Sequence, residues 1–201
     1  METLYNFLST KDFAIHPILL KVLNRICYLI FSYTSLRLKN YLIHNLNYMF
    51  TLNRFEYNPL LSPNKSHPWE TYAAFNGCPA KLGKKRFLIY RAMSEPDAFR
   101  EPHMSMSVVA SASSVDGILY SDRSVLIAPK EEYDQYGCED PRVTKLGDTY
   151  YVFYTALGGY PFSKDNIKVA VALTSDLKNV KERHLVTPFN AKAMVMFPEK
   201  I

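Results

Sequence analysis

The sequence predicts an all-β protein of the propeller type with an α-helical extension at its N-terminus. The chain has 201 residues, of which 14% are aromatic, and its 15 Tyr and 12 Phe favour strands. A segment also recurs, because Lys81-Leu82-Gly83 and the apolar run 86–92 return 64 residues later as Lys145-Leu146-Gly147 and 150–156. Repeated units of about four short strands are typical of propeller blades.

The repeats place the main domain at residues 54–201. The strand expected at 108–117 returns 61 residues later at 169–177, and the final residues 197–201 resemble the start of each unit. A propeller ring needs at least four blades to close. We therefore predict a partial propeller of about two to three blades, which is truncated at its C-terminus or completed by another chain.

Residues 1–53 form the predicted helical extension. Apolar residues dominate from Ile18 to Phe31, and Lys21 and Arg25 fall on one side at helical spacing. The uninterrupted apolar part is far shorter than the roughly 20 residues that span a bilayer. We expect this helix to pack on the main domain or on another subunit, as in a homo-oligomer. An interfacial membrane helix, disfavoured by the sparse basic face, and an unstructured extension are the alternatives.

Composition excludes several classes of protein. The net charge is +5, but the basic residues are scattered, so no nucleic-acid partner is expected. The histidines lack metal-ligand spacing, and the cysteines include no Cys-x-x-Cys pair, so neither a metal site nor a disulfide framework is predicted. The start of the chain lacks the basic region of a secretion signal. A reducing, cytoplasmic location is the prediction.

The sequence Gly137-Cys138-Glu139-Asp140-Pro141-Arg142 lies directly before a predicted β-hairpin that turns at Gly147. Proline disfavours helical backbone at the preceding residue, so Asp140 is expected in extended conformation. A carboxylate at the start of a rigid hairpin suits a general acid. On spacing alone, a solvated Asp-Pro turn is an equal alternative.

Motifs in residues 54–201 resemble those of glycoside hydrolase family 130. The family consists of five-bladed β-propeller enzymes that act on β-mannosides, mostly as inverting phosphorylases. The resemblance is carried, in this order, by Asn58–Pro63, Phe75-Asn76, Tyr90-Arg91-Ala92, Ser113–Ile118, Glu139–Val143 and Asn190–Ile201.

The resemblance implies a role for individual residues. Asp140 matches the family's general acid, and Asn76, Arg91 and Lys192 match residues at the sugar site. Glu139, in the same motif as Asp140, is a candidate substrate-binding residue. The implied partners are a β-mannoside oligosaccharide and inorganic phosphate as co-substrate, with no cofactor and no metal. The family's later phosphate-binding residues would lie beyond the end of this sequence.

The predicted function is cleavage of β-mannosidic bonds with inversion, by attack of inorganic phosphate. Alternatives are a propeller fragment that hydrolyses glycans or binds them without turnover, and a membrane-surface protein anchored by its N-terminal helix. For single residues, Arg91 is balanced between packing and sugar binding, and Lys192 could be an ordinary exposed lysine. Trp69 is expected to pack in the core or at its rim, and the tyrosines Tyr150, Tyr151 and Tyr154 are expected to lie mostly in the core.

Overall fold

A computed structural model describes residues 52–96 and 102–199. Residues 55–201 form one compact unit, distinct from residues 1–54. The described part consists of strands and two short 3-10 helices, η1 (Pro68–Glu70) and η2 (Lys164–Asn166), which confirms the all-β prediction. The predicted N-terminal helix lies outside the described residues. Within the described residues, no helix has the length and apolar character needed to cross a membrane.

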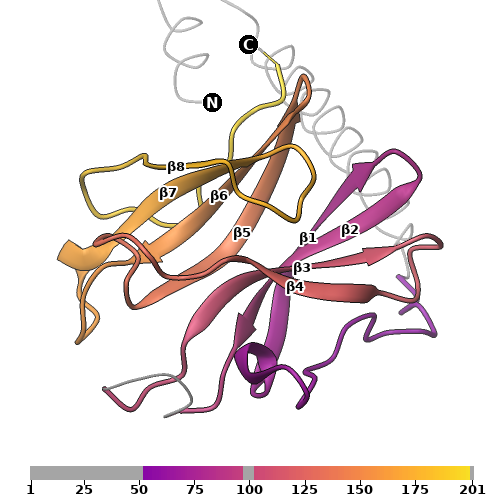
Figure 1. Cartoon of the computed structure of the whole chain (residues 1–201), viewed down its shortest axis with the longest axis horizontal. Helices are drawn as coiled ribbons and strands as arrows, with labels where there is room; N and C mark the ends of the chain where they lie inside the picture. Colours follow the sequence, from indigo (N-terminus) through magenta and orange to yellow (C-terminus); the bar gives the residue numbers. More distant parts are fainter. Residues whose placement is uncertain (1–51, 97–101, 200–201) are drawn as a thin grey trace, which may run out of the picture. The chain divides into compact units, whose positions relative to one another are not determined.

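Eight strands form two four-stranded antiparallel sheets, in which each strand pairs with the next along the chain (Figure 1). The first sheet contains β1 (Ala73–Leu82), β2 (Lys85–Met93), β3 (Ser107–Ser114) and β4 (Ser121–Ile127). The second contains β5 (Gly137–Leu146), β6 (Thr149–Leu157), β7 (Ile167–Thr174) and β8 (Glu182–Leu185). The repeat predicted from the sequence is therefore a repeat of whole sheets.

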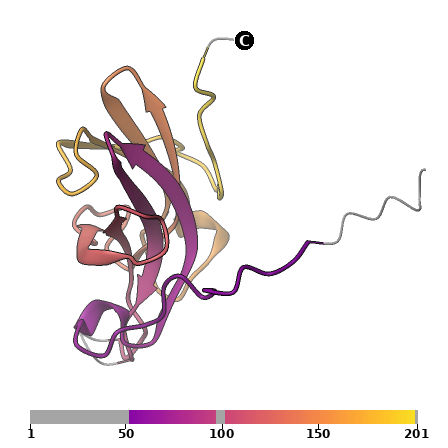
Figure 2. The ribbon, with the colours of Figure 1, turned by 90° about the vertical axis from the view of Figure 1, so that its right-hand side faces the viewer.

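The opening hairpin of each sheet has the same turn. Leu82 pairs with Lys85 across a two-residue turn, and Leu146 pairs with Thr149 in the same way. The first turn residue is glycine in both, with φ of 59° at Gly83 and 60° in the second sheet, as a type II′ turn requires. This turn follows the right-handed twist of the strands, which is visible in the curved β1–β2 hairpin (Figure 2).

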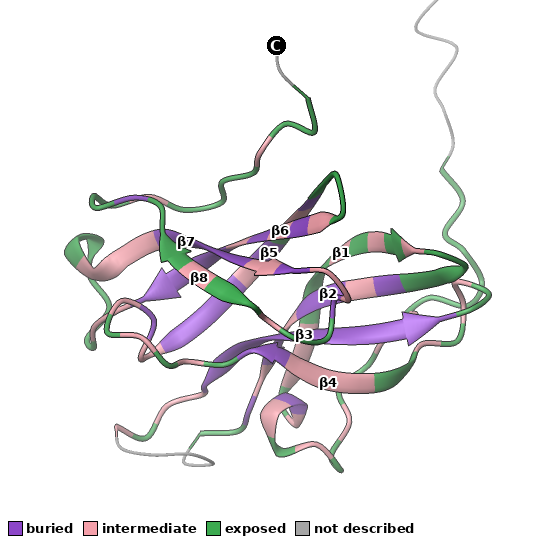
Figure 3. Ribbon diagram, turned by 45° about the horizontal axis from the view of Figure 1, so that its top comes forward, coloured by how far each residue is buried: buried purple, intermediate pink, exposed green. Residues whose placement is uncertain are grey.

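The main hydrophobic core lies between the sheets. Buried side chains of the first sheet, such as Phe87 and Ile89, pack with buried side chains of the second, such as Val152. Tyr150 and Tyr154 belong to this core, which confirms their predicted burial, whereas Tyr151 is only partly buried and is not one of the core residues. Strand β5 lies against β1, β2 and β3 of the first sheet. The interior strands accordingly carry most of the buried residues (Figure 3).

A second cluster covers the other face of the first sheet. Tyr90, Ala92 and buried residues of β3 pack there against Leu61 and Trp69. Trp69 also stacks on the His67 ring, with 5.0 Å between ring centroids. The prediction that Trp69 serves packing is confirmed.

A buried carboxylate ties together the first sheet. Glu70, fully buried in η1, accepts a hydrogen bond from the Tyr90 hydroxyl (2.7 Å) and pairs with Arg123 of β4 (3.0 Å). Burial, followed by the hydrogen bond to Glu70, raises the pKa of Tyr90. The phenol therefore keeps its proton more firmly than an ordinary tyrosine and serves as the donor to Glu70.

The second sheet repeats this cluster. Fully buried Asp134 accepts a hydrogen bond from the Tyr154 hydroxyl (2.8 Å) and lies 3.6 Å from an Arg183 guanidinium nitrogen. Its other oxygen accepts two backbone N–H bonds of 2.8 Å from the loop before β5. An acid, a tyrosine and an arginine thus join the entry loop, second strand and fourth strand of each sheet. The sequence analysis missed this repeated cluster.

Replacing Tyr90 by phenylalanine tests the cluster. Tyr90→Phe removes a donor from a buried carboxylate and should lower the free energy of unfolding by about 1–3 kcal/mol. Tyr154→Phe should cost a similar amount in the second sheet. Tyr72→Phe, at an exposed tyrosine, is the matched control. Urea unfolding measures all three, and equal stability of Tyr90→Phe and Tyr72→Phe would contradict the assigned role.

Candidate active site

The first strand of each sheet contains a bulge at the same place. In β1 the pairing moves from Phe75–Arg91 to Cys78–Ile89, which inserts one extra residue. In β5 it moves from Glu139–Thr155 to Arg142–Phe153, with the same insertion. The two bulges lie 64 residues apart, at the interval of the sequence repeat.

Asn76 and Asp140 are the bulge residues with left-handed backbone, and φ is 51° at both. The prediction that Pro141 holds Asp140 in extended conformation is therefore wrong. The extra residue must be accommodated by a local turn of the strand, and this requirement overrides the preference imposed by proline. Asn and Asp tolerate left-handed backbone better than other non-glycine residues.

The bulges bring the two side chains together across the sheets. Asn76 Nδ2 donates a hydrogen bond of 2.6 Å to Asp140 Oδ1. The Asp140 side chain is 12% exposed, so it is largely shielded but accessible from one side. It does not form the solvated turn that the sequence left open as an alternative.

Arg91, on β2, lies between both carboxylates of the β5 bulge. Its Nη1 is 3.4 Å from Asp140 Oδ1, and its Nη2 forms a short ion pair with Glu139. Its Nε donates to Ser107 Oγ at 3.0 Å, and Ser107 Oγ donates to Glu139 Oε1 at 3.3 Å. The Phe75 ring covers the guanidinium, with 4.9 Å from the ring centroid to Cζ.

Lys192 reaches the same carboxylates from the segment that follows β8. Its Nζ lies 3.3 Å from Asp140 Oδ2 and 3.6 Å from Glu139 Oε2. One backbone and one side-chain hydrogen bond hold this segment on the second sheet, from Ala191 N to a β7 carbonyl (3.2 Å) and from the Thr144 hydroxyl to the Met196 carbonyl (2.7 Å). The Lys192 side chain is 52% exposed, so it covers the carboxylates from the solvent side.

Two cations and two carboxylates therefore meet at one point. Burial by itself raises the pKa of Asp140, but the Asn76 hydrogen bond and the charges of Arg91 and Lys192 outweigh it. The net effect is a pKa below the ordinary value for aspartate. Without a ligand, Asp140 is an ionised carboxylate at neutral pH.

The structure brings together all five candidate residues from the sequence analysis, namely Asn76, Arg91, Glu139, Asp140 and Lys192. Sequence reasoning missed Ser107, which joins Arg91 to Glu139. Its position opposite Met93 at the start of β3 depends on strand register, for which the sequence has no local signal. In the described ranges, no group of His, Cys, Asp or Glu is arranged to hold a metal ion.

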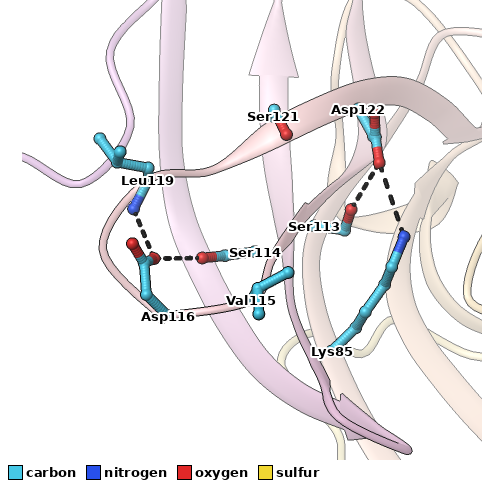
Figure 4. A pocket seen from close by; sticks show the side chains of 8 residues that line it. All are labelled: Lys85, Ser113, Ser114, Val115, Asp116, Leu119, Ser121 and Asp122. Carbon is cyan, nitrogen blue, oxygen red and sulfur yellow. Dashed lines mark hydrogen bonds and ion pairs between the residues drawn. The ribbon is translucent and has the colours of Figure 1, made fainter.

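An open hollow of about 240 Å³ lies at the opposite end of β3 from Ser107 (Figure 4). Most of its polar side chains already have partners in the fold. Asp116 accepts bonds from Ser114 Oγ (2.8 Å) and from the Leu119 backbone N–H (3.0 Å), as expected of a turn residue. Backbone hydrogen bonds, first of all that from Ile118, lower the pKa of Asp116 to about 2. We assign this hollow to turn structure, away from the candidate active site.

A family model described as beta-1,4-mannooligosaccharide phosphorylase, that of glycoside hydrolase family 130, matches residues 52–201. The chain belongs to glycoside hydrolase family 130. This agrees with the resemblance seen in its motifs.

Two curated relatives match about three quarters of this chain. A beta-1,2-mannobiose phosphorylase of Thermoanaerobacter sp. (strain X514) is 34% identical over 160 residues, which span 76% of this chain and 52% of that protein. A beta-1,2-mannobiose phosphorylase of Listeria innocua is 27% identical, and the match covers 74% of this chain and 54% of that protein. The chain thus spans about half the length of the curated relatives it matches.

Solved structures share the fold. The Listeria innocua beta-1,2-mannobiose phosphorylase in complex with beta-1,2-mannobiose has a TM-score of 0.55 at 23% identity, over 74% of this chain and 55% of that one. A putative glycoside hydrolase from Bacteroides ovatus has a TM-score of 0.50 at 28% identity, over 65% and 39%.

Acid titration of the folded chain tests the charge balance around Asp140. Because its pKa is lower in the folded chain, ionised Asp140 stabilises the fold above about pH 4, and this contribution disappears as pH falls through the folded pKa. Asp140→Asn should therefore lose less stability than wild type when the pH is lowered from about 6 to about 3. Urea unfolding at several pH values measures the difference.

Lys192→Met serves as the comparison in this experiment. It keeps the carboxylate but removes one cation, so it should raise the pKa of Asp140. The fall in the free energy of unfolding on acidification should then begin at a higher pH than in wild type. The same loss of stability between about pH 6 and about pH 3 in wild type and both variants would contradict the described electrostatics.

Proposed function

We propose that this chain forms the proton-donating side of a β-mannoside phosphorylase site. In this proposal, the two sheets are consecutive blades of a five-bladed propeller, and inorganic phosphate cleaves the β-mannosidic bond with inversion. Membership of family 130 supports the substrate class. The observation that carries the proposal is the convergence of four polar side chains around Asp140, from β1, β2, β5 and the segment after β8.

Asp140 is the proposed general acid. The bond from the anomeric carbon to the leaving oxygen breaks, a bond from that carbon to a phosphate oxygen forms, and the leaving oxygen takes a proton from Asp140, directly or through a sugar hydroxyl. The bulge supports this role because it holds the carboxyl group in a fixed position on a strand, next to Asn76.

A general acid must carry a proton, whereas ligand-free Asp140 is ionised. An anion bound beside Arg91 and Lys192 would offset their positive charge and raise the pKa of Asp140. Phosphate would then promote protonation of the acid that its own reaction requires. The half-exposed ammonium of Lys192 is the cation best placed to meet an incoming phosphate.

The remaining polar groups suit a sugar. Asn76, Arg91 and Glu139 together offer donors and acceptors within a few ångströms of Asp140, as neighbouring hydroxyl groups require. The curated relatives are named for β-1,2 linkages and the family model for β-1,4, so both linkages belong in the test. The cytoplasmic location, the absence of a cofactor and association through the N-terminal helix stay predictions.

One observation favours a second candidate, glycan binding without phosphorolysis. The lowered pKa of Asp140 suits a hydrogen-bond acceptor for sugar hydroxyls. Because the chain spans about half the length of its curated relatives, the second half of the site is not among its residues if those relatives use their full length. Binding and turnover must therefore be measured separately.

The test uses the 201-residue chain with β-1,2- or β-1,4-mannobiose, with and without inorganic phosphate. We expect phosphate-dependent formation of a mannose 1-phosphate signal in ³¹P NMR, and a loss of about 100-fold or more in Asp140→Asn. Calorimetry in parallel reports binding of the disaccharide. Binding without a phosphorylated product would favour the second candidate, and equal turnover by Asp140→Asn would contradict the role of Asp140.

A further inference from the structure

Ser107 completes a closed ring of three side chains. Its hydroxyl accepts a bond from Arg91 Nε (3.0 Å) and donates one to Glu139 Oε1 (3.3 Å), while Arg91 Nη2 pairs with Glu139 directly. The three residues come from β2, β3 and β5, so the ring joins the two sheets. Ser107 is 2% exposed, which keeps water from replacing either bond.

The ring determines which way the Arg91 guanidinium faces. A guanidinium has five N–H donors in one rigid plane. With Nε–H bound to Ser107, Nη1 and Nη2 are directed at Asp140 and Glu139. The Phe75 ring covers the guanidinium face and restricts rotation further.

We propose that Ser107 is a positioning residue, which orients Arg91 so that one guanidinium serves both carboxylates of the β5 bulge. It contacts neither Asp140 nor a substrate in this role and acts through Arg91. For its effect on turnover, the inference rests on the proposed function. The orientation of Arg91 is a property of the ligand-free chain and does not depend on it.

Comparison with the second sheet argues against a general packing role. The residue at the place of Arg91 in the repeat is Thr155, which pairs with Glu139 and Val169 as Arg91 pairs with Phe75 and Val109. Its buried hydroxyl has no hydrogen-bond partner among the described residues. Among the residues that the structure describes, the tyrosine–acid–arginine cluster occurs in both sheets, whereas the Ser107 ring occurs once, next to the carboxylates of β5.

Ser113 provides a matched control on the same strand. It is also 2% exposed, and its hydroxyl donates a 3.0 Å bond to a carboxylate, that of Asp122. It lies at the end of β3 remote from the candidate active site, where it lines the hollow of Figure 4. Ser113→Ala therefore reproduces the loss of a buried hydroxyl without touching Arg91.

The experiment is an NMR titration of the Asp140 side-chain carboxyl in the 201-residue chain, for wild type, Ser107→Ala and Ser113→Ala. Loss of the Nε acceptor frees the guanidinium to turn away, so Ser107→Ala should raise the pKa of Asp140 toward its ordinary value. The Arg91 Nε–H signal should also exchange faster with water. Ser113→Ala should change neither measurement, although both variants lose a buried hydrogen bond.

A double-variant cycle shows whether Ser107 acts through Arg91. In an Arg91→Lys background, which lacks the Nε–H donor, Ser107→Ala should add no further shift. Equal pKa values of Asp140 in Ser107→Ala and Ser113→Ala would overturn the proposal. A shift of the same size in both backgrounds would also overturn it, because Ser107 would then act without Arg91.

Turnover is a separate readout. With mannobiose and phosphate, Ser107→Ala should lower kcat/KM by on the order of 10- to 100-fold, while Ser113→Ala keeps the wild-type value. Absence of turnover in every variant would contradict the proposed function, and the titration would still decide the role of Ser107. The two failures are therefore distinguishable.

Discussion

The candidate active site depends on one extra residue in the first strand of each sheet. Each insertion produces left-handed backbone, at Asn76 and Asp140, and the bulges bring these side chains within 2.6 Å of each other. Regular strands would alternate their side chains between the two faces of each sheet. The bulges are therefore what directs polar side chains from two separate sheets to a common point.

The scaffold and the candidate active site use charge in different ways. In the scaffold, a fully buried acid with a tyrosine and an arginine recurs in both sheets, where it ties the entry loop to the second and fourth strands. At the candidate active site, two carboxylates and two cations gather at a single place, and Lys192 remains half exposed. In the first arrangement the acid is fully buried, whereas in the second a half-exposed lysine leaves the carboxylates accessible to a ligand.

The sequence predicted the repeat, the hairpins, the strand content and the five candidate residues. These features depend on local patterns, such as Gly83 and its counterpart in the second sheet, or on motifs shared with a known family. It predicted the backbone of Asp140 wrongly, because the preference imposed by Pro141 is local whereas the bulge depends on pairing with β6. Ser107 was missed because its partners lie 16 and 32 residues away and belong to other strands.

Mapping a bound sugar onto the chain tests the central claim most directly. Titration of β-1,2-mannobiose into the isotope-labelled 201-residue chain should shift the NMR signals of Asn76, Arg91 and Glu139 together, with a single affinity. Signals of Lys85 and Asp122, which line the distant hollow, should not move. Shifts centred on that hollow, or no shifts at saturating sugar, would contradict the account.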